Sequence, residues 1–386
     1  MSVFAIKSDH LVLPDNVDAS GYLLVKDGRF AEVLDAAPQG VEVIDRTDCW
    51  VAPGLFDTHI HGFVGHDVMD CDPAAVTTIC QELVRHGTTS WLATTLTASI
   101  EQTGKACASV AEAVKEQGDD FVGTRTQGIF LEGPFFTEEH KGAQNPKYLV
   151  DPDVAVLDQW QREAGGLIAK SALAPERKGT IAYTKAMGER GITVALGHTS
   201  ATADECLAAV QAGAGVFVHT YNGMSDMLHR NPGPVGCAMT TANTYSELIC
   251  DGMHVHPLVC EALVRAKGWE HVALITDCLS CGGLEDGDYF IGELPIELRG
   301  GAAYLKGAGN LAGSTLTMAK AVRNVVEWGM VTPSQALRMA SEIPARSVGM
   351  DDRLGMIAPG RFADLVVMDK DMALVETYLG GKVVAF

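Results

Sequence analysis

The chain has 386 residues, a formal net charge of −20, and 47% hydrophobic and 20% charged residues. Such a chain can bury a sizeable core and suits one large domain with a smaller partner domain. Its acidic charge repels nucleic acid and anionic membrane surfaces, and no apolar run reaches about 18 residues, so we expect no nucleic-acid partner and no membrane partner.

Both ends of the chain read as short β-strands. Residues 1–52 contain a hairpin signal at Asp27-Gly28 between two apolar runs, and residues 355–386 return to the same pattern in ADLVVMD and ALVETYLGGKVVAF. Two β-rich ends that flank a different middle predict one small β-sandwich domain built from both termini.

Residues 53–354 alternate apolar, β-branched runs with amphipathic segments that end at a glycine, as in AAVTTICQELVRHG. This repeat predicts an α/β fold, a (β/α)8 TIM barrel. The expected strands cover residues 54–61, 89–96, 127–133, 167–174, 192–198, 215–222, 246–254 and 272–278.

Active sites of such barrels lie at the C-terminal ends of the strands, so the polar residues that end these runs should form one set. The first run ends in His59 and His61, which point to the same side of an extended strand and could hold one metal ion. Two half-buried structural histidines are the alternative.

Three further runs end in candidate metal ligands, namely Glu132, His198 and His219. A carboxylate that ends an apolar strand is costly unless it is paired or bound to a metal. Four imidazoles and one carboxylate suit zinc, iron or a similar divalent ion, and two ions if Glu132 bridges them.

The last run ends in Asp277, which could act as a general acid/base on a water at the metal. Its alternative role is an N-cap of the next helix. Lys170 lies near the start of its run, at the wrong end for a bridging carboxylated lysine.

Three loops carry possible substrate contacts. His254 ends the seventh run, and Arg230 lies in the loop between the sixth and seventh runs, where a guanidinium could bind phosphate. The glycine-rich stretch 307–314 could bring backbone N–H groups close to a ligand. The ten cysteines are scattered, and the first residues lack the pattern of a signal peptide. Both features favour a cytoplasmic protein with reduced thiols. Cys278 and Cys281 have C-x-x-C spacing, but there is no second such pair.

The motifs PGLFDTHIHG, LEGPF, LGHTSA, HTYNGM, DGMH, ITDC, LAGSTLTM and PGRFADLVV together resemble the amidohydrolase superfamily. More narrowly, they are similar to the N-acetylglucosamine-6-phosphate deacetylases. The resemblance implies core metal ligands Glu132, His198 and His219, a second-ion pair His59 and His61, and Asp277 as the catalytic acid/base. It also implies a homodimer in which Arg230 acts across the interface. The substrate-binding positions that it implies are Ala143, Gln144, Asn222, Gly223, Arg230, His254, Leu311, Ala312 and Gly313.

One position departs from the family pattern. The family usually has a histidine in K-G-x-H-N-P, and here Gln144 stands in its place. An amide can donate a hydrogen bond but cannot carry a positive charge. A related substrate such as N-acetylgalactosamine-6-phosphate is therefore an alternative.

The resulting prediction is metal-dependent hydrolysis of the acetamide of N-acetylglucosamine-6-phosphate. One or two divalent ions are expected, zinc first, with iron, cobalt, manganese or cadmium as alternatives. A cyclic amidase or nucleobase deaminase of the same superfamily, and a catalytically silent metal-stabilised binding protein, are the rival interpretations.

Overall fold

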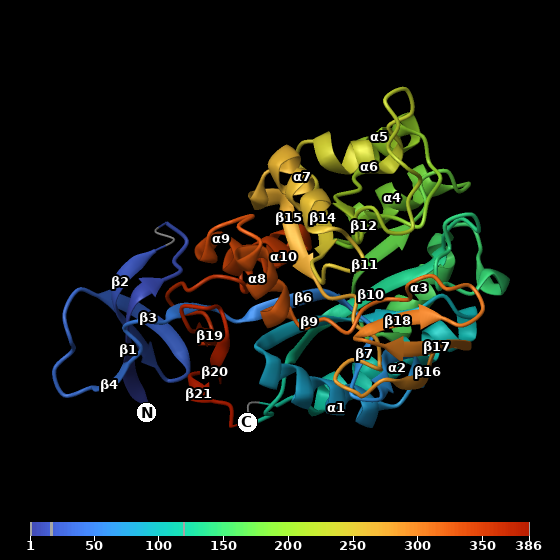
Figure 1. Cartoon of the computed structure of the whole chain (residues 1–386). Coiled ribbons are helices and arrows are strands. Elements are labelled where there is room, and N and C mark those ends of the chain that lie inside the picture. Colours follow the sequence, from blue (N-terminus) through green and yellow to red (C-terminus); the bar gives the residue numbers. More distant parts are fainter. Residues whose placement is uncertain (1, 16–17, 119, 386) are drawn as a thin grey trace.

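The computed structural model describes residues 2–15, 18–118 and 120–385 and contains a barrel and a sheet made from both ends of the chain (Figure 1). Positions 1 and 386, the outer limits of the expected terminal domain, lie outside these residues. Within the described ranges, the helices are too short or too polar to cross a membrane.

The barrel strands are parallel and follow one another around the sheet in chain order, which confirms the predicted (β/α)8 barrel. They are β6 (Leu55–Ile60), β9 (Thr88–Thr95), β10 (Arg125–Phe135), β11 (Ile168–Leu173), β12 (Thr193–Leu196), β13 (Val216–Phe217), β14 (Tyr245–Ile249) and β15 (Val272–Ile275).

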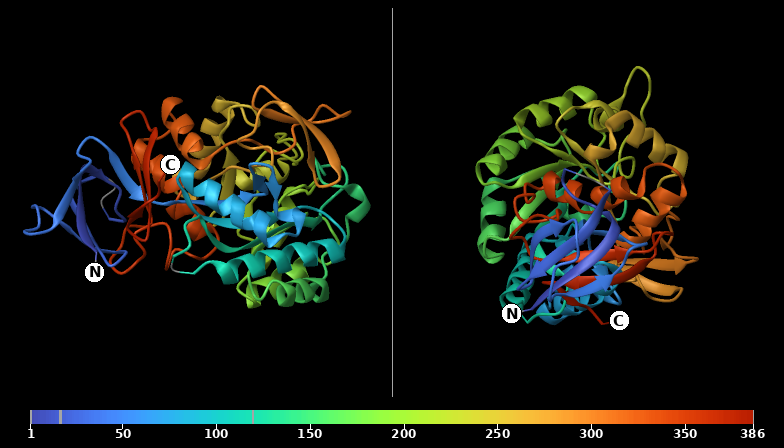
Figure 2. Two further views of the ribbon diagram at one scale, coloured as in Figure 1. Left: turned by 90° about the horizontal axis from the view of Figure 1, so that it is seen from below. Right: turned by 90° about the vertical axis from the view of Figure 1, so that its left-hand side faces the viewer.

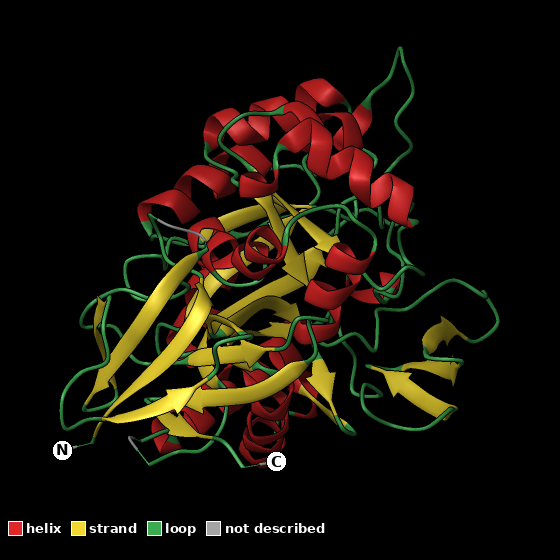
Figure 3. Cartoon of the chain, turned by 60° about the vertical axis from the view of Figure 1, so that its left-hand side comes forward, coloured by secondary structure: helices red, strands yellow, loops and turns green. Residues whose placement is uncertain are grey.

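One helix follows each barrel strand, and Figure 3 shows helices along the outside of the strands. These are α1 (Pro73–Leu83), α2 (Ile100–Glu116), α3 (Val154–Glu163), α4 (Thr180–Glu189), α5 (Ala203–Ala212), α6 (Gly233–Thr240), α7 (Pro257–Lys267) and α8 (Met318–Glu327), with α9 (Pro333–Met339) and α10 (Glu342–Ser347) after them. Local signals set their ends. For example, Thr202 and Glu205 form a capping box at the start of α5, and Gly213 ends it.

The first and last barrel strands meet at the C-terminal end of the barrel. Asp277 N donates to His59 O over 2.8 Å, and His61 N donates to Cys278 O over 2.9 Å. The Thr276 hydroxyl donates to Asp57 Oδ2 over 2.5 Å. These bonds join the segments that carry two predicted ligands and the predicted acid/base.

Strands from both termini form one mixed sheet, and Figure 2 shows its blue and red strands together at one end of the molecule. The order is β21-β20-β19-β5-β1-β2-β3, with β4 paired to β1. The bounds are β1 (Val3–Leu11), β2 (Ala19–Lys26), β3 (Arg29–Leu34), β4 (Glu42–Asp45), β5 (Trp50–Pro53), β19 (Leu365–Met368), β20 (Leu374–Leu379) and β21 (Lys382–Val383).

The terminal sheet folds over a common core. The rings of Phe4 and Tyr378, from its two halves, stack with centroids 6.2 Å apart. Phe30 N donates to Arg361 O over 3.0 Å, which joins β3 to the segment before β19. The N-terminal and C-terminal strands therefore stabilise one another.

A small antiparallel sheet after β15 was not among the expected elements. It consists of β16 (Gly287–Ile291), β17 (Leu294–Arg299) and β18 (Ala302–Leu305). Its turns contain glycines with positive φ, as at Gly292 (φ 52) and Gly300 (φ 59). Near the barrel mouth lie the short strands β7 (Gly62–Phe63) and β8 (His66–Asp67), which pair with each other.

Candidate active site

Three predicted site residues occupy the same place relative to their strands. His198, His219 and Asp277 each lie two residues beyond the end of β12, β13 and β15. Each has a positive φ, of 47°, 28° and 50°. Non-glycine residues adopt this region only where the surrounding structure holds them, and such positions concentrate at functional sites. The strand ends therefore turn these side chains toward the barrel axis at a cost in backbone energy.

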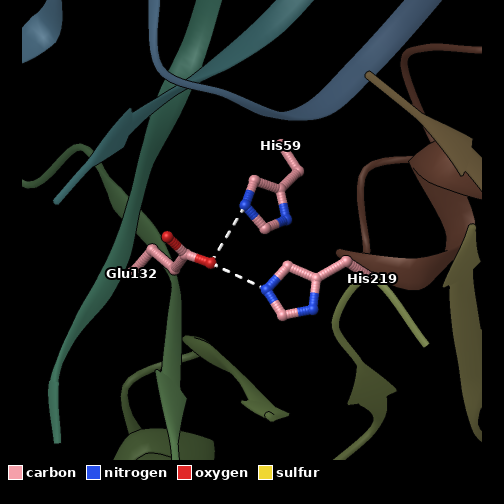
Figure 4. Close-up of side chains that lie close together, drawn as sticks. All are labelled: His59, Glu132 and His219. Atoms are coloured by element: carbon pink, nitrogen blue, oxygen red, sulfur yellow. Dashed lines mark hydrogen bonds and ion pairs between the residues drawn. The ribbon is translucent and has the colours of Figure 1, made fainter. Parts of the chain in front are cut away.

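Glu132, near the end of β10, lies at the centre of four imidazoles, three of which approach the same carboxylate oxygen. The Nε2 atoms of His59, His198 and His219 lie 3.2, 3.3 and 3.1 Å from Glu132 Oε1. His61 Nε2 lies 3.3 Å from the other oxygen, Oε2. Figure 4 shows His59 and His219 pointing at Glu132 from two sides.

Asp277 lies against the same cluster. Its Oδ1 is 3.2 Å from His61 Nε2 and 3.5 Å from His59 Nε2. The predicted ligands and the predicted acid/base, separated by up to 218 positions in the chain, thus share one buried site. Two overlapping sets of donor atoms lie within 4.8 Å of one another, namely His59, Glu132 and His219, and His59, His61 and Asp277.

The chemistry of these donors fits a divalent cation. The Nε2 atoms of His198 and His219 face each other at 3.1 Å, a contact that leaves lone pairs opposed unless a proton or a cation lies between them. His198 Nδ1 donates to His140 O over 2.8 Å, so its Nε2 carries the lone pair. Among the residues described, His59 Nε2 is buried, and its 3.2 Å contact with Glu132 Oε1 lacks the geometry of a hydrogen bond.

The charges of this cluster are strongly linked. Burial would raise the pKa of Glu132, but His59, His198 and His219 lower it well below its usual range. Burial lowers the pKa of His59, and Glu132 and Asp277 outweigh that effect and raise it to about 9. Without a cation, the cluster therefore takes up protons that a bound metal would displace.

Gln144 contacts Glu132 directly. Its Nε2 donates to Glu132 Oε2 over 2.6 Å, and its Oε1 accepts from Thr97 N over 2.9 Å. Both bonds hold the amide in one orientation. Gln144, which stands where the family pattern has a histidine, is therefore a direct hydrogen-bond partner of the Glu132 carboxylate.

A cavity of about 320 Å³ opens above the cluster. Glu132, His61, His198, His219 and Asp277 line its base. The predicted substrate-binding residues that line it are Ala143, Gln144, Asn222, Gly223, His254, Leu311, Ala312 and Gly313. His254 is held by Asp251, whose Oδ2 accepts from its Nδ1 over 2.6 Å.

Arg230 does not line this cavity in its own chain. It lies on an exposed loop beside Met227 and Leu228, whose side chains are 52% and 59% exposed. This yellow-green loop projects from the barrel beyond α5 and α6 (Figure 1). Arg230 is therefore the one predicted substrate-binding residue, among those that the structure describes, that lies away from this cavity.

A larger cavity of about 600 Å³ adjoins the first and shares Leu96, Ala143 and Ile291 with it. Its other lining residues include four carboxylates, Asp67, Asp70, Asp288 and Glu293. Such a wall repels a phosphorylated ligand. The smaller cavity, which ends on the imidazoles, is the better candidate site.

Two polar residues near the site were not predicted as functional. Glu247 in β14 and Lys170 in β11 are fully buried and form an ion pair. Burial would raise the pKa of Glu247, but Lys170 and His59 lower it to about 2. The signal in the sequence was a charged residue inside each of two apolar barrel strands.

Comparisons with known proteins extend over nearly the whole chain. The model of the amidohydrolase family matches residues 50–384. The chain is 36% identical over 364 residues to the N-acetylgalactosamine-6-phosphate deacetylase of Escherichia coli O157:H7, covering 94% of each chain. It is 37% identical over 332 residues to the N-acetylglucosamine-6-phosphate deacetylase of Vibrio furnissii, covering 86% of this chain and 82% of that relative. The crystal structure of N-acetyl-D-glucosamine-6-phosphate deacetylase from Mycobacterium smegmatis matches it with a TM-score of 0.92 at 29% identity, covering 99% of this chain and 100% of that one.

Proposed function

Since the chain belongs to the amidohydrolase family, and its relatives include deacetylases of phosphorylated amino sugars, we propose that it hydrolyses the acetamide of N-acetylglucosamine-6-phosphate. The products are glucosamine-6-phosphate and acetate. The observation that carries the proposal is the convergence of Glu132, His198, His219 and Asp277 at the base of one cavity. A cyclic amidase or a deaminase would not call for the phosphate contact assigned to Arg230.

A divalent cation would be held by Glu132, His198 and His219, with His59 and His61 available for a second ion. Nitrogen and carboxylate donors of this kind suit zinc, and iron, cobalt, manganese and cadmium are alternatives. The cation supplies Lewis-acid chemistry when bound.

Asp277 is the proposed catalytic acid/base. Its carboxylate lies at the base of the cavity and can remove a proton from the attacking water. The same group then returns the proton to the departing amine nitrogen. Gln144, fixed by Thr97 and Glu132, lies where its amide can contact the acetamide.

The remaining cavity residues hold the sugar phosphate. His254 is oriented by Asp251 and faces the cavity beside Asn222 and the backbone of Leu311 to Gly313. We infer that Arg230 binds the phosphate in the cavity of a second copy, so that the active form is a homodimer. Holding the substrate in this way itself lowers the barrier. A cytoplasmic location is proposed with this function.

N-acetylgalactosamine-6-phosphate is the second candidate substrate. The observations that favour it are Gln144, in place of the family's usual histidine, and the similarity to the Escherichia coli relative. Steady-state kinetics of the zinc-loaded protein on both phosphorylated epimers and on the free sugars tests the proposal. We expect a much higher kcat/KM on one of the phosphorylated sugars. Equal turnover of the free sugars would favour another amidohydrolase, and no turnover of a panel of acyl amino sugars would favour a silent binding protein.

The role of Asp277 is tested by Asp277→Asn. Loss of a general acid/base costs about 10²- to 10⁴-fold in rate, so we expect turnover to fall by that factor or more. Bound metal, measured by elemental analysis, should stay near the wild-type level. Full activity in this variant would refute the assignment.

A further inference from the structure

Lys170, Glu247 and His59 form a buried polar chain inside the barrel. They come from three different strands, β11, β14 and β6. All three side chains are 0% exposed. The proposed chemistry uses neither Lys170 nor Glu247, and both lie on the opposite side of the His59 ring from Glu132.

Each polar atom of Glu247 is satisfied. Its Oε2 accepts from His59 Nδ1 over 3.0 Å. Its Oε1 accepts from the Lys170 ammonium, and Thr58 Oγ1 approaches the same oxygen at 3.4 Å. Lys170 Nζ also lies 3.4 Å from Thr58 O and 3.7 Å from the centre of the Phe130 ring. Lys170, both oxygens of Glu247 and His59 Nδ1 therefore form one connected network, which ends at the His59 ring.

Stability alone does not account for this network. The charges of Lys170 and Glu247 must be removed from water, and a buried ion pair often contributes no more than apolar residues of similar volume. The inside of such a barrel is otherwise filled by branched apolar side chains. The specific effect of the Lys170–Glu247 pair is that it orients the His59 ring.

The network determines which nitrogen of His59 is available. An ionised carboxylate can only accept, so His59 Nδ1 must carry a proton and donate it to Glu247. The lone pair of the neutral ring then lies on Nε2, the atom that is 3.2 Å from Glu132 Oε1 and 3.5 Å from Asp277 Oδ1. Lys170 fixes the rotamer of Glu247 through their ion pair.

We propose that Lys170 and Glu247 are positioning residues that orient His59 for metal binding. Glu247 holds the ring and its tautomer, and Lys170 holds Glu247. The inference rests on the proposed metal site and adds to it two residues outside the ligand set. Outer partners of metal-bound histidines affect affinity by about 10- to 100-fold.

The test is zinc affinity, measured by competition with a chromophoric chelator after the purified protein has been stripped of metal. The main variant is Lys170→Met/Glu247→Gln, which removes both charges and leaves neither one unpaired. We expect zinc affinity to fall about 10- to 100-fold while the urea midpoint of the metal-free protein stays near that of the wild type. Glu247→Asp keeps both charges and draws the carboxylate back from His59 Nδ1, so it is the milder variant if the double variant folds poorly; we expect about a 10-fold loss.

His59→Asn provides the specificity check, because it removes the side chain through which the network acts. In that background the double substitution should leave zinc affinity unchanged. Glu342→Gln is the matched control, since it breaks a buried ion pair with Arg338 in the helices outside the barrel. It should lower stability without changing zinc affinity.

The outcomes separate the two claims. If the wild-type protein binds no zinc and no other divalent ion of the proposed set, the proposed function fails and the inference with it. If the wild type binds zinc and the double variant binds it equally well, only the inference is overturned. An equal loss of affinity with and without His59 would also overturn it.

Discussion

The mouth of the barrel buries polar side chains, whereas the core of the terminal sheet buries apolar ones. The mouth buries four imidazoles and two carboxylates in mutual contact, and three of these six residues have a positive φ. The terminal sheet buries apolar side chains from both ends of the chain, namely Phe4, Ile6, Leu23, Val25, Leu365, Val367 and Tyr378 among others. Its main charged pair, Arg46 and Glu376, stays at the margin, 29% and 18% exposed.

The terminal sheet therefore stabilises the fold, whereas the buried polar groups of the barrel mouth destabilise it. Burial of apolar surface stabilises the terminal sheet in proportion to area. The barrel mouth has no comparable gain, because its charges oppose burial until a cation neutralises them. Substitutions in the two regions should therefore separate activity from stability.

Glu132→Gln should have the largest effect. It should lower metal affinity and activity and leave the stability of the metal-free protein nearly unchanged. The carboxylate that four imidazoles approach is lost, so zinc affinity and kcat/KM should both fall, the latter by about a thousandfold or about 4 kcal/mol. The urea midpoint of the metal-free protein should change little. Steady-state kinetics, zinc titration and urea unfolding measure the three quantities. A variant that retained wild-type activity and metal content would contradict the assignment of the metal site to the barrel mouth.

Leu365→Ala should show the reverse pattern. Leu365 is fully buried in the terminal core, and removing a buried leucine side chain costs about 2–5 kcal/mol. We expect a lower urea midpoint, while kcat per native molecule at 25 °C stays unchanged. Val375→Ala, on a side chain of β20 that is 40% exposed, is the control. Equal effects of the two variants would contradict the assigned core.

The barrel and the cluster of polar residues at its mouth could be predicted because their signals are local. Each barrel strand is a short apolar run, and His198, His219 and Asp277 are the polar residues at which such runs end. The parallel order then brings them to one rim without any knowledge of side-chain contacts. The terminal sheet followed from matching strand patterns at both ends of the chain.

What could not be predicted depends on contacts between distant positions. Lys170 lies at the start of β11, and the sequence does not show that its long side chain reaches Glu247, 77 positions away. The β16–β18 sheet gives only short alternating runs between glycines, which are also typical of loops. The projecting position of Arg230 depends on the path of a loop, for which the sequence carries no periodic signal.

Gly223→Ala should produce an intermediate effect at the mouth. A Cβ on Gly223 would lie 2.7 Å from His198 Nδ1 and 3.2 Å from His140 O, the two atoms of the bond that orients His198. Its φ of +60° adds backbone strain. We expect zinc affinity to fall about 10-fold. Gly215→Ala, where nothing lies within 4 Å of the added Cβ, should leave zinc affinity unchanged.

Glu376→Gln should give the smallest effect and should depend on pH. Burial raises the pKa of Glu376, but hydrogen bonds from Arg46 and Tyr378 lower it overall. A carboxylate whose pKa is lower in the folded state stabilises the fold above its unfolded pKa, about 4.3, and loses that contribution as pH falls below it. For a partly exposed pair we expect a loss of at most about 1 kcal/mol at pH 7.

Urea unfolding of the wild type and of Glu376→Gln between pH 3 and pH 7 should show two curves that converge at low pH. Because Arg46 and Glu376 join the N-terminal and C-terminal segments, the difference reports on the terminal sheet and should leave zinc affinity untouched. Glu101→Gln, in a solvent-exposed pair with Lys105 on α2, is the control and should show a much smaller difference of the same sign, because solvent screens this pair. A gap that widened as pH fell would reverse the sign and exclude this ion pair as its source.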